Sequence, residues 1–103
     1  MENSRDYTRN VVHQFMNEVI EQGFHELVNR PQESTRLNIL IQSATHRLGE
    51  QLHRIDHHDF REGSKELQDY WLSIAFSAER ESLEMLSEIQ RIQQQYNPRL
   101  KRV

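Results

Sequence analysis

The chain has 103 residues, of which 35% are hydrophobic, and its formal net charge is −3 at pH 7. This length predicts one domain, and an apolar content below the usual ~45–50% favours narrow stripes on long helices over a thick core. The acidic balance argues against general nucleic-acid binding, and the chain lacks cysteine, a transmembrane run and a secretory signal. We therefore expect a cytoplasmic protein with no disulfide, no cofactor and no membrane interaction.

Apolar residues recur at helical spacing over residues 7–28 and predict a first helix. Gly23 lies inside this pattern, where glycine costs about 1 kcal/mol relative to alanine, and we interpret it as a close helix crossing. The stripe is broad, so we expect this helix to contact two neighbours. Its members are Val11, Val12, Phe15, Met16, Val19, Ile20, Phe24, Leu27 and Val28.

A second helix is predicted over residues 31–57, because Pro31 and the acidic residue after it suit a first helical turn. Its apolar residues step by three or four positions and form a continuous seam. In the link that follows, we interpret Gly63 as a helix terminator and Ser64 as the N-cap of the next helix. The seam consists of Leu37, Ile41, Ala44, Leu48, Leu52 and Ile55.

The third predicted helix, residues 64–96, has the strongest periodicity in the chain. It would be roughly 50 Å long, so it needs long partners, a bend or a second chain to cover it. Pro98 ends it, a short basic tail follows, and the glutamines 93–95 are assigned to its solvated side. The apolar stripe consists of Leu67, Trp71, Ile74, Ala78, Met85, Ile89, Ile92 and Tyr96, with one skipped position at Ser82.

Short links between long helices predict antiparallel neighbours. The expected fold class is therefore all-α, an antiparallel bundle of three long helices in one domain over residues 1–103. Because the apolar supply is thin, we also expect a homodimer in which the third helix joins a larger helical bundle.

A row of histidine and glutamate in the second helix offers a metal-binding alternative. Glu50, His53 and His57 lie three and four residues apart, so their side chains can point the same way. Such a row can bind zinc or a similar ion when another element supplies further ligands. Glu50 and His53 also match the Glu-x-x-His unit of ferritin-like di-iron proteins, which need two copies facing the bundle interior. The row lies opposite the apolar seam, so metal binding is not the preferred hypothesis.

Three arginines repeat every seven residues beside the seam of the second helix, and an acidic row lies on the third. We interpret the two rows as pairing within the bundle. The alternative is that the arginines form a docking strip for an acidic partner or a phosphate. The arginines are Arg47, Arg54 and Arg61, with Arg36 on the opposite shoulder, and the acids are Glu81, Glu84 and Glu88.

Aromatic residues gather in the first half of the third helix. Tyrosine and tryptophan are enriched at binding hot spots, and Tyr70 is a candidate of this kind, whereas Trp71 is assigned to the core. Phe76 and Ile39 lie off the seams of their helices and need cover from a second chain or another partner.

The preferred function is a small non-catalytic interaction module, an adaptor, assembly chaperone or regulator that binds itself and a larger protein through amphipathic helix faces. No catalytic motif is found, so we do not expect an enzyme. Two alternatives stay open: a metal-binding or ferritin-like di-iron protein that uses Glu50, His53 and His57, and a regulator associated with nucleic acid. The candidate partner-binding residues are Arg47, Arg54, Arg61, Tyr70, Phe76 and Ile39.

Overall fold

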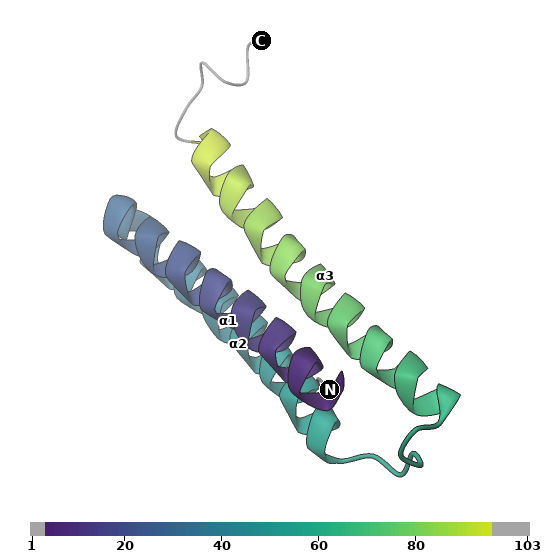
Figure 1. The fold of residues 1–103 in the computed structure, drawn as a ribbon. Helices are drawn as coiled ribbons and strands as arrows, with labels where there is room; N and C mark the ends of the chain where they lie inside the picture. The colour runs from purple at the N-terminus through teal and green to yellow at the C-terminus, as the bar shows by residue number, and fades with distance from the viewer. Residues whose placement is uncertain (1–3, 96–103) are drawn as a thin grey trace.

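The computed structural model describes residues 4–95, and three long helices make up most of that range. They run up, down and up, and each packs against the other two (Figure 1). The predicted all-α bundle of three long helices is confirmed, and the described part of the chain holds no strand. The predicted helix end at Tyr96 and the basic tail lie outside the described residues. The elements are α1 (Ser4–Asn29), η1 (Pro31–Glu33), α2 (Ser34–Asp56) and α3 (Lys65–Gln95).

The buried face of α1 differs from the predicted apolar stripe. Phe24 and Val28 are 55% and 80% exposed, so their assignment to the stripe is wrong. Helical residues are about 100° apart around the axis, and Phe24 is therefore turned away from the face that Gly23 and Glu26 share. The residues of α1 that are fully buried are Thr8, Val12, Val19, Gly23 and Glu26.

Gly23 lies where α1 closely approaches both α2 and α3. A Cβ atom at this position would lie 2.7 Å from Ile41 Cδ1 on α2 and 3.1 Å from Met85 Cε on α3. The contact with Ile41 is shorter than Cβ atoms tolerate and the contact with Met85 is tight, so a side chain at this position would force its neighbours to move. The predicted close crossing is confirmed, and α1 continues through it without a break.

The predicted seams of α2 and α3 form the core, and the α3 seam continues through Ser82, which is 1% exposed. A short 3₁₀ turn over Pro31–Glu33 precedes α2, so the predicted helix start at Pro31 is three residues early. Gly63 has a φ of +77° in the turn before α3, whereas α2 already ends at Asp56, so Gly63 does not terminate α2. The predicted cap is confirmed, because Ser64 Oγ accepts a hydrogen bond from the Leu67 N–H at 3.1 Å.

A buried carboxylate joins the helices at the end of the bundle where α1 and α3 finish. Glu26 is 2% exposed. Its Oε2 lies 2.5 Å from Arg30 Nη1, and its Oε1 accepts a hydrogen bond from Gln93 Nε2 at 2.7 Å. Gln93 is therefore half-buried, and its assignment to the solvated side is wrong. A buried charge of this kind is tolerated because each of its oxygens has a partner.

Candidate interaction surface

The predicted pairing of the arginine row with the acidic row of α3 holds for Arg47, and for Arg36 on the opposite shoulder, but not for Arg54 or Arg61. Arg47 Nη1 lies 3.2 Å from Glu81 Oε2 and 3.8 Å from Glu84 Oε2. Arg36 Nη2 lies 3.8 Å from Glu88 Oε2. These ion pairs border a groove of about 400 Å³ whose apolar lining is Leu40, Ala44 and Met85. Within the bundle, the charges help to select which helices lie side by side.

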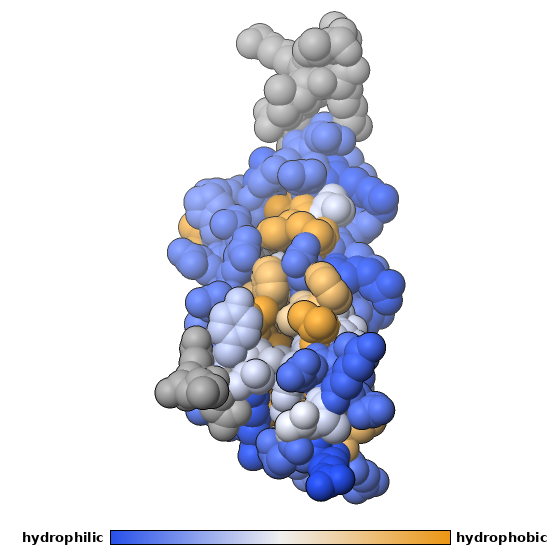
Figure 2. Space-filling model, turned by 45° about the vertical axis from the view of Figure 1, so that its right-hand side comes forward, coloured by the Kyte–Doolittle hydropathy of each residue, from blue (hydrophilic) through white to orange (hydrophobic). Residues whose placement is uncertain are grey.

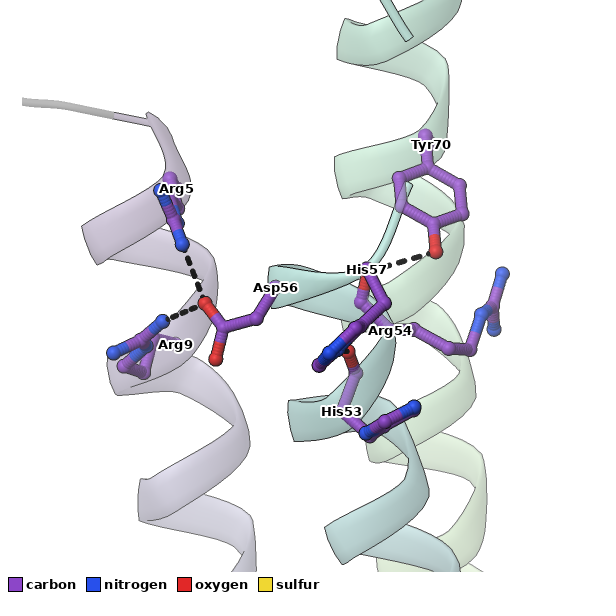
Figure 3. Close-up of polar contacts among 7 residues, drawn as sticks. All are labelled: Arg5, Arg9, His53, Arg54, Asp56, His57 and Tyr70. Atoms are coloured by element: carbon purple, nitrogen blue, oxygen red, sulfur yellow. Dashed lines mark hydrogen bonds and ion pairs between the residues drawn. The ribbon is translucent and has the colours of Figure 1, made fainter. Parts of the chain in front are cut away.

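Arg54 and Tyr70 contact each other at the end of α2. The Tyr70 hydroxyl donates a hydrogen bond to the Arg54 carbonyl oxygen at 2.9 Å, and the Arg54 guanidinium lies 5.1 Å from the centre of the Tyr70 ring (Figure 3). Both side chains are half-buried. Arg61 lies in the link between α2 and α3, is exposed, and accepts a backbone hydrogen bond from Ser64. Arg54 and Tyr70 thus hold α2 against α3, and these contacts are made within the chain, without a partner protein.

An aromatic cluster attaches the α2–α3 link to the first turns of α3. The His58 ring packs edge-on against Trp71 with centroids 5.3 Å apart, and it lies 5.6 Å from Tyr70. The Phe60 N–H donates to His58 Nδ1 at 3.1 Å. The sequence reasoning did not identify His58 and Phe60 as members of this cluster, because no helical period covers the link.

Asp56 ends α2 and binds two arginines of α1. Arg5 Nη2 lies 2.5 Å from Asp56 Oδ1, and Arg9, one turn later, bonds to the same oxygen (Figure 3). The hydrogen bond from Arg5 and the nearby charge of Arg9 hold the pKa of Asp56 below its usual value. The sequence reasoning did not predict this site, since the two arginines and the aspartate are far apart in the chain.

The metal row lies on the exposed side of α2, opposite the apolar seam as the sequence predicts, and its side chains form two separate pairs. Glu50 Oε1 lies 3.1 Å from His46 Nε2, while the rings of His53 and His57 stack with centroids 3.9 Å apart. Glu50, His53 and His57 are all exposed. Across residues 4–95 no three His, Cys, Asp or Glu side chains are grouped so that they could hold a metal ion. The three candidates therefore point to solvent, whereas a ferritin-like site requires side chains that face the bundle interior.

A line of exposed apolar side chains runs along α3. Leu72, Phe76 and Leu83 are 56%, 66% and 54% exposed. Their spacing of four and seven residues places them on one face, which is turned away from the buried Ile74 and Ala78. We call these three residues the outer stripe. Only Phe76 was a candidate from the sequence, although the spacing of Leu72 and Leu83 from it carried the same signal.

An apolar groove of about 230 Å³ lies beside the start of the outer stripe, between α1 and α3. Tyr7, which is 57% exposed, and Leu72 are among its lining residues, with Trp71 and Ala75. Figure 2 shows apolar side chains gathered along the long axis of one face, with polar side chains on both sides. Ile39, a further candidate from the sequence, is 59% exposed on the side of α2 opposite Ile41, so it does not belong to the outer stripe.

No protein-family model matches this chain, and no curated protein or solved structure matches it significantly. None of the helices within the described range is long and apolar enough to cross a membrane. The function is therefore inferred from the chain's own surfaces and contacts.

Proposed function

We propose that this protein is a small non-catalytic protein–protein interaction module, working as an adaptor, assembly chaperone or regulator. The observation that carries the proposal is the outer stripe, in which Leu72, Phe76 and Leu83 are each more than half exposed on one face. Single apolar side chains are common on protein surfaces, but Leu72 and Phe76, one turn apart, expose adjoining apolar areas that are stabilised when a partner covers them. Glu79, which is exposed, separates them from Leu83 on the same face.

Three charged side chains, Glu26, Asp56 and Arg47, have partners on neighbouring segments of the bundle. Glu26 is bound by Arg30 and Gln93, and Asp56 is bound by two arginines of α1. Arg47 bridges α2 to α3. These contacts give the three charged groups a structural role. They support a function of the protein that depends on the shape of its surface rather than on catalysis.

The outer stripe has the spacing that an amphipathic helix of a partner protein recognises. Its residues stand at positions i, i+4 and i+11 of one continuous helix, so a second helix can lie along them. Phe76, the most exposed of the three, is the expected central anchor, because aromatic side chains bury the largest area per residue.

The test compares wild type with L72E/F76E and with the control F24E/V28E, which changes two exposed apolar residues at the same spacing on α1. Each protein is immobilised and exposed to an extract of its native source, and the retained proteins are quantified by mass spectrometry. We expect a stoichiometric partner, foreign or a second copy, on wild type and F24E/V28E but not on L72E/F76E. If three folded proteins retain the same set, the outer stripe is not a binding surface.

A further inference from the structure

Two side chains of the α2–α3 link, residues 57–64, pack on the second turn of α3. The His58 ring lies edge-on against Trp71 with centroids 5.3 Å apart, and the Phe60 ring lies 4.9 Å from the Tyr70 ring. Trp71 is 7% exposed. The link therefore covers aromatic side chains of α3 that would otherwise face water.

A hydrogen bond inside the link requires a neutral His58 ring. The Phe60 N–H donates to His58 Nδ1 at 3.1 Å, so this nitrogen carries a lone pair and not a proton. A neutral imidazole has one unprotonated nitrogen, whereas a protonated imidazole has two N–H groups and no acceptor. A proton on Nδ1 would point at the Phe60 N–H, and the two donors would repel each other.

His58 differs from the other five histidines of the chain in its surroundings. It is half-buried and contacts the rings of Phe60, Tyr70 and Trp71. Histidine side chains usually gain their proton between about pH 8 and about pH 5. In this range protonation of His58 acts on the packing of the link, whereas protonation of the others acts on exposed side chains. The exposed histidines are His13, His25, His46, His53 and His57.

A charged His58 ring would lie near a cation that is already in place. The Arg54 guanidinium on α2 is 5.1 Å from the centre of the Tyr70 ring, and the centre of the His58 ring is 5.6 Å from the same point. Arg54 thus makes a cation–π contact with Tyr70 and repels a second cation beside this ring.

The other charged groups at this end are paired or exposed. On α1, Arg5 and Arg9 are bound by Asp56. The charged or titratable side chains of the link and of the first turn of α3 are exposed, so water and salt screen their effect on His58. They are His57, Asp59, Arg61, Glu62, Lys65 and Glu66.

We propose that His58 is a pH-sensitive switch for the link. While the ring is neutral, the link stays on α3. When Nδ1 takes a proton from the solvent, the Phe60 N–H loses its acceptor and bonds to water, and the link leaves Tyr70 and Trp71. Trp71 also lines the groove beside the outer stripe, so release of the link extends the apolar surface of that groove. Only this last consequence rests on the proposed function.

Trp71 is the only tryptophan of the chain, so its fluorescence tests the switch directly. We expect acrylamide, a neutral quencher, to quench wild type about twofold more strongly at about pH 5 than at about pH 8. H58N cannot gain a proton, and its amide oxygen can accept the Phe60 N–H as in an Asx-turn. Its quenching should therefore be equal at both pH values. The control H57N changes the exposed neighbour and should respond as wild type does.

The switch is wrong if quenching of wild type is the same at both pH values, or if it rises in H58N as much as in wild type. Circular dichroism at the same pH values measures the helix content. A loss of helix that accompanies the rise in quenching would mean that the whole bundle unfolds, and it would also contradict the switch. No partner takes part in these measurements, so their outcome is separate from that of the retention test of the outer stripe.

Discussion

The two ends of the bundle are closed by different chemistry. Where α1 and α3 finish, one carboxylate, Glu26, is 2% exposed and has a partner on each oxygen. At the opposite end the carboxylate of Asp56 is 42% exposed, and the aromatic cluster around His58 supplies the apolar contacts. A charge that is already hydrated contributes little when it is paired, whereas a buried charge is costly as soon as it loses a partner. We therefore expect the two ends to respond very differently to substitution.

The largest effect is expected at the buried end. E26A leaves Arg30 without its carboxylate and Gln93 without an acceptor, and it should lower the free energy of unfolding by about 3 kcal/mol or more. Urea denaturation followed by circular dichroism gives the value. E26Q keeps one acceptor oxygen and should cost less than E26A. A loss below about 1 kcal/mol for E26A would mean that water enters this end of the bundle.

Substitution of Gly23, one turn before Glu26, distinguishes the effect of side-chain packing on stability from the effect of helix propensity. G23A places a methyl group against Ile41 and Met85 and should destabilise the protein by about 1–3 kcal/mol. The matched control is Gly49, two turns before Asp56 in α2, where an added Cβ meets nothing within 4 Å. G49A should stabilise the protein by about 0.5–1 kcal/mol, because alanine favours the helix. Thermal melts of both variants measure the two effects. Equal shifts of the melting temperature in the same direction would contradict the close helix crossing at Gly23.

At the aromatic end, Y70F removes the hydrogen bond to the Arg54 carbonyl and keeps the ring contacts with His58 and Trp71. We expect a loss of about 0.5–1.5 kcal/mol, the usual range for one neutral hydrogen bond. Denaturation in urea measures it, with Y7F as the control, since Tyr7 is mostly exposed. A loss as large as that of E26A would show that the two ends depend equally on polar contacts.

The smallest effect is expected at Asp56, and it depends on pH. The pKa of Asp56 is lower in the folded protein than in the unfolded chain, so the folded state binds its proton less readily. Its contribution is therefore complete above the unfolded pKa of about 3.9 and is lost as the pH falls through the folded pKa. D56N should be slightly less stable than wild type at pH 7, and the difference should vanish near pH 2. A difference that grows as the pH falls would contradict the ion pair.

High salt extends the same comparison without any mutation. At about 1 M NaCl the Debye length is about 3 Å, so the exposed pairs of Asp56 with Arg5 and Arg9 are screened more than the buried pair of Glu26 and Arg30. The difference between wild type and D56N should shrink in salt, whereas the E26A difference should persist. Urea titrations at low and high salt provide the four values.

Periodicity predicted the helices and most of the core, because one-dimensional spacing determines which residues share a face of a helix. Within the described residues, the seams of α2 and α3 are buried as predicted except for the half-buried Leu52, and Ser64 caps α3. Helix bounds differed by up to three residues, at the ends where caps and 3₁₀ turns compete with the helix. The pairing of Arg47 with the acidic row followed from the same spacing combined with an up-down-up order.

The sequence by itself determined the fold class, the three helices and the faces that α2 and α3 bury, since these depend on local propensity and on spacing along the chain. Only the tertiary structure decided that Glu26 is buried while Phe24 is exposed, because the direction of each neighbouring helix sets how much of α1 is covered. It also decided that Arg5 and Arg9 meet Asp56, and that Leu72, Phe76 and Leu83 stay uncovered. Contacts between distant segments and surfaces without a partner arise from packing, which spacing alone does not encode.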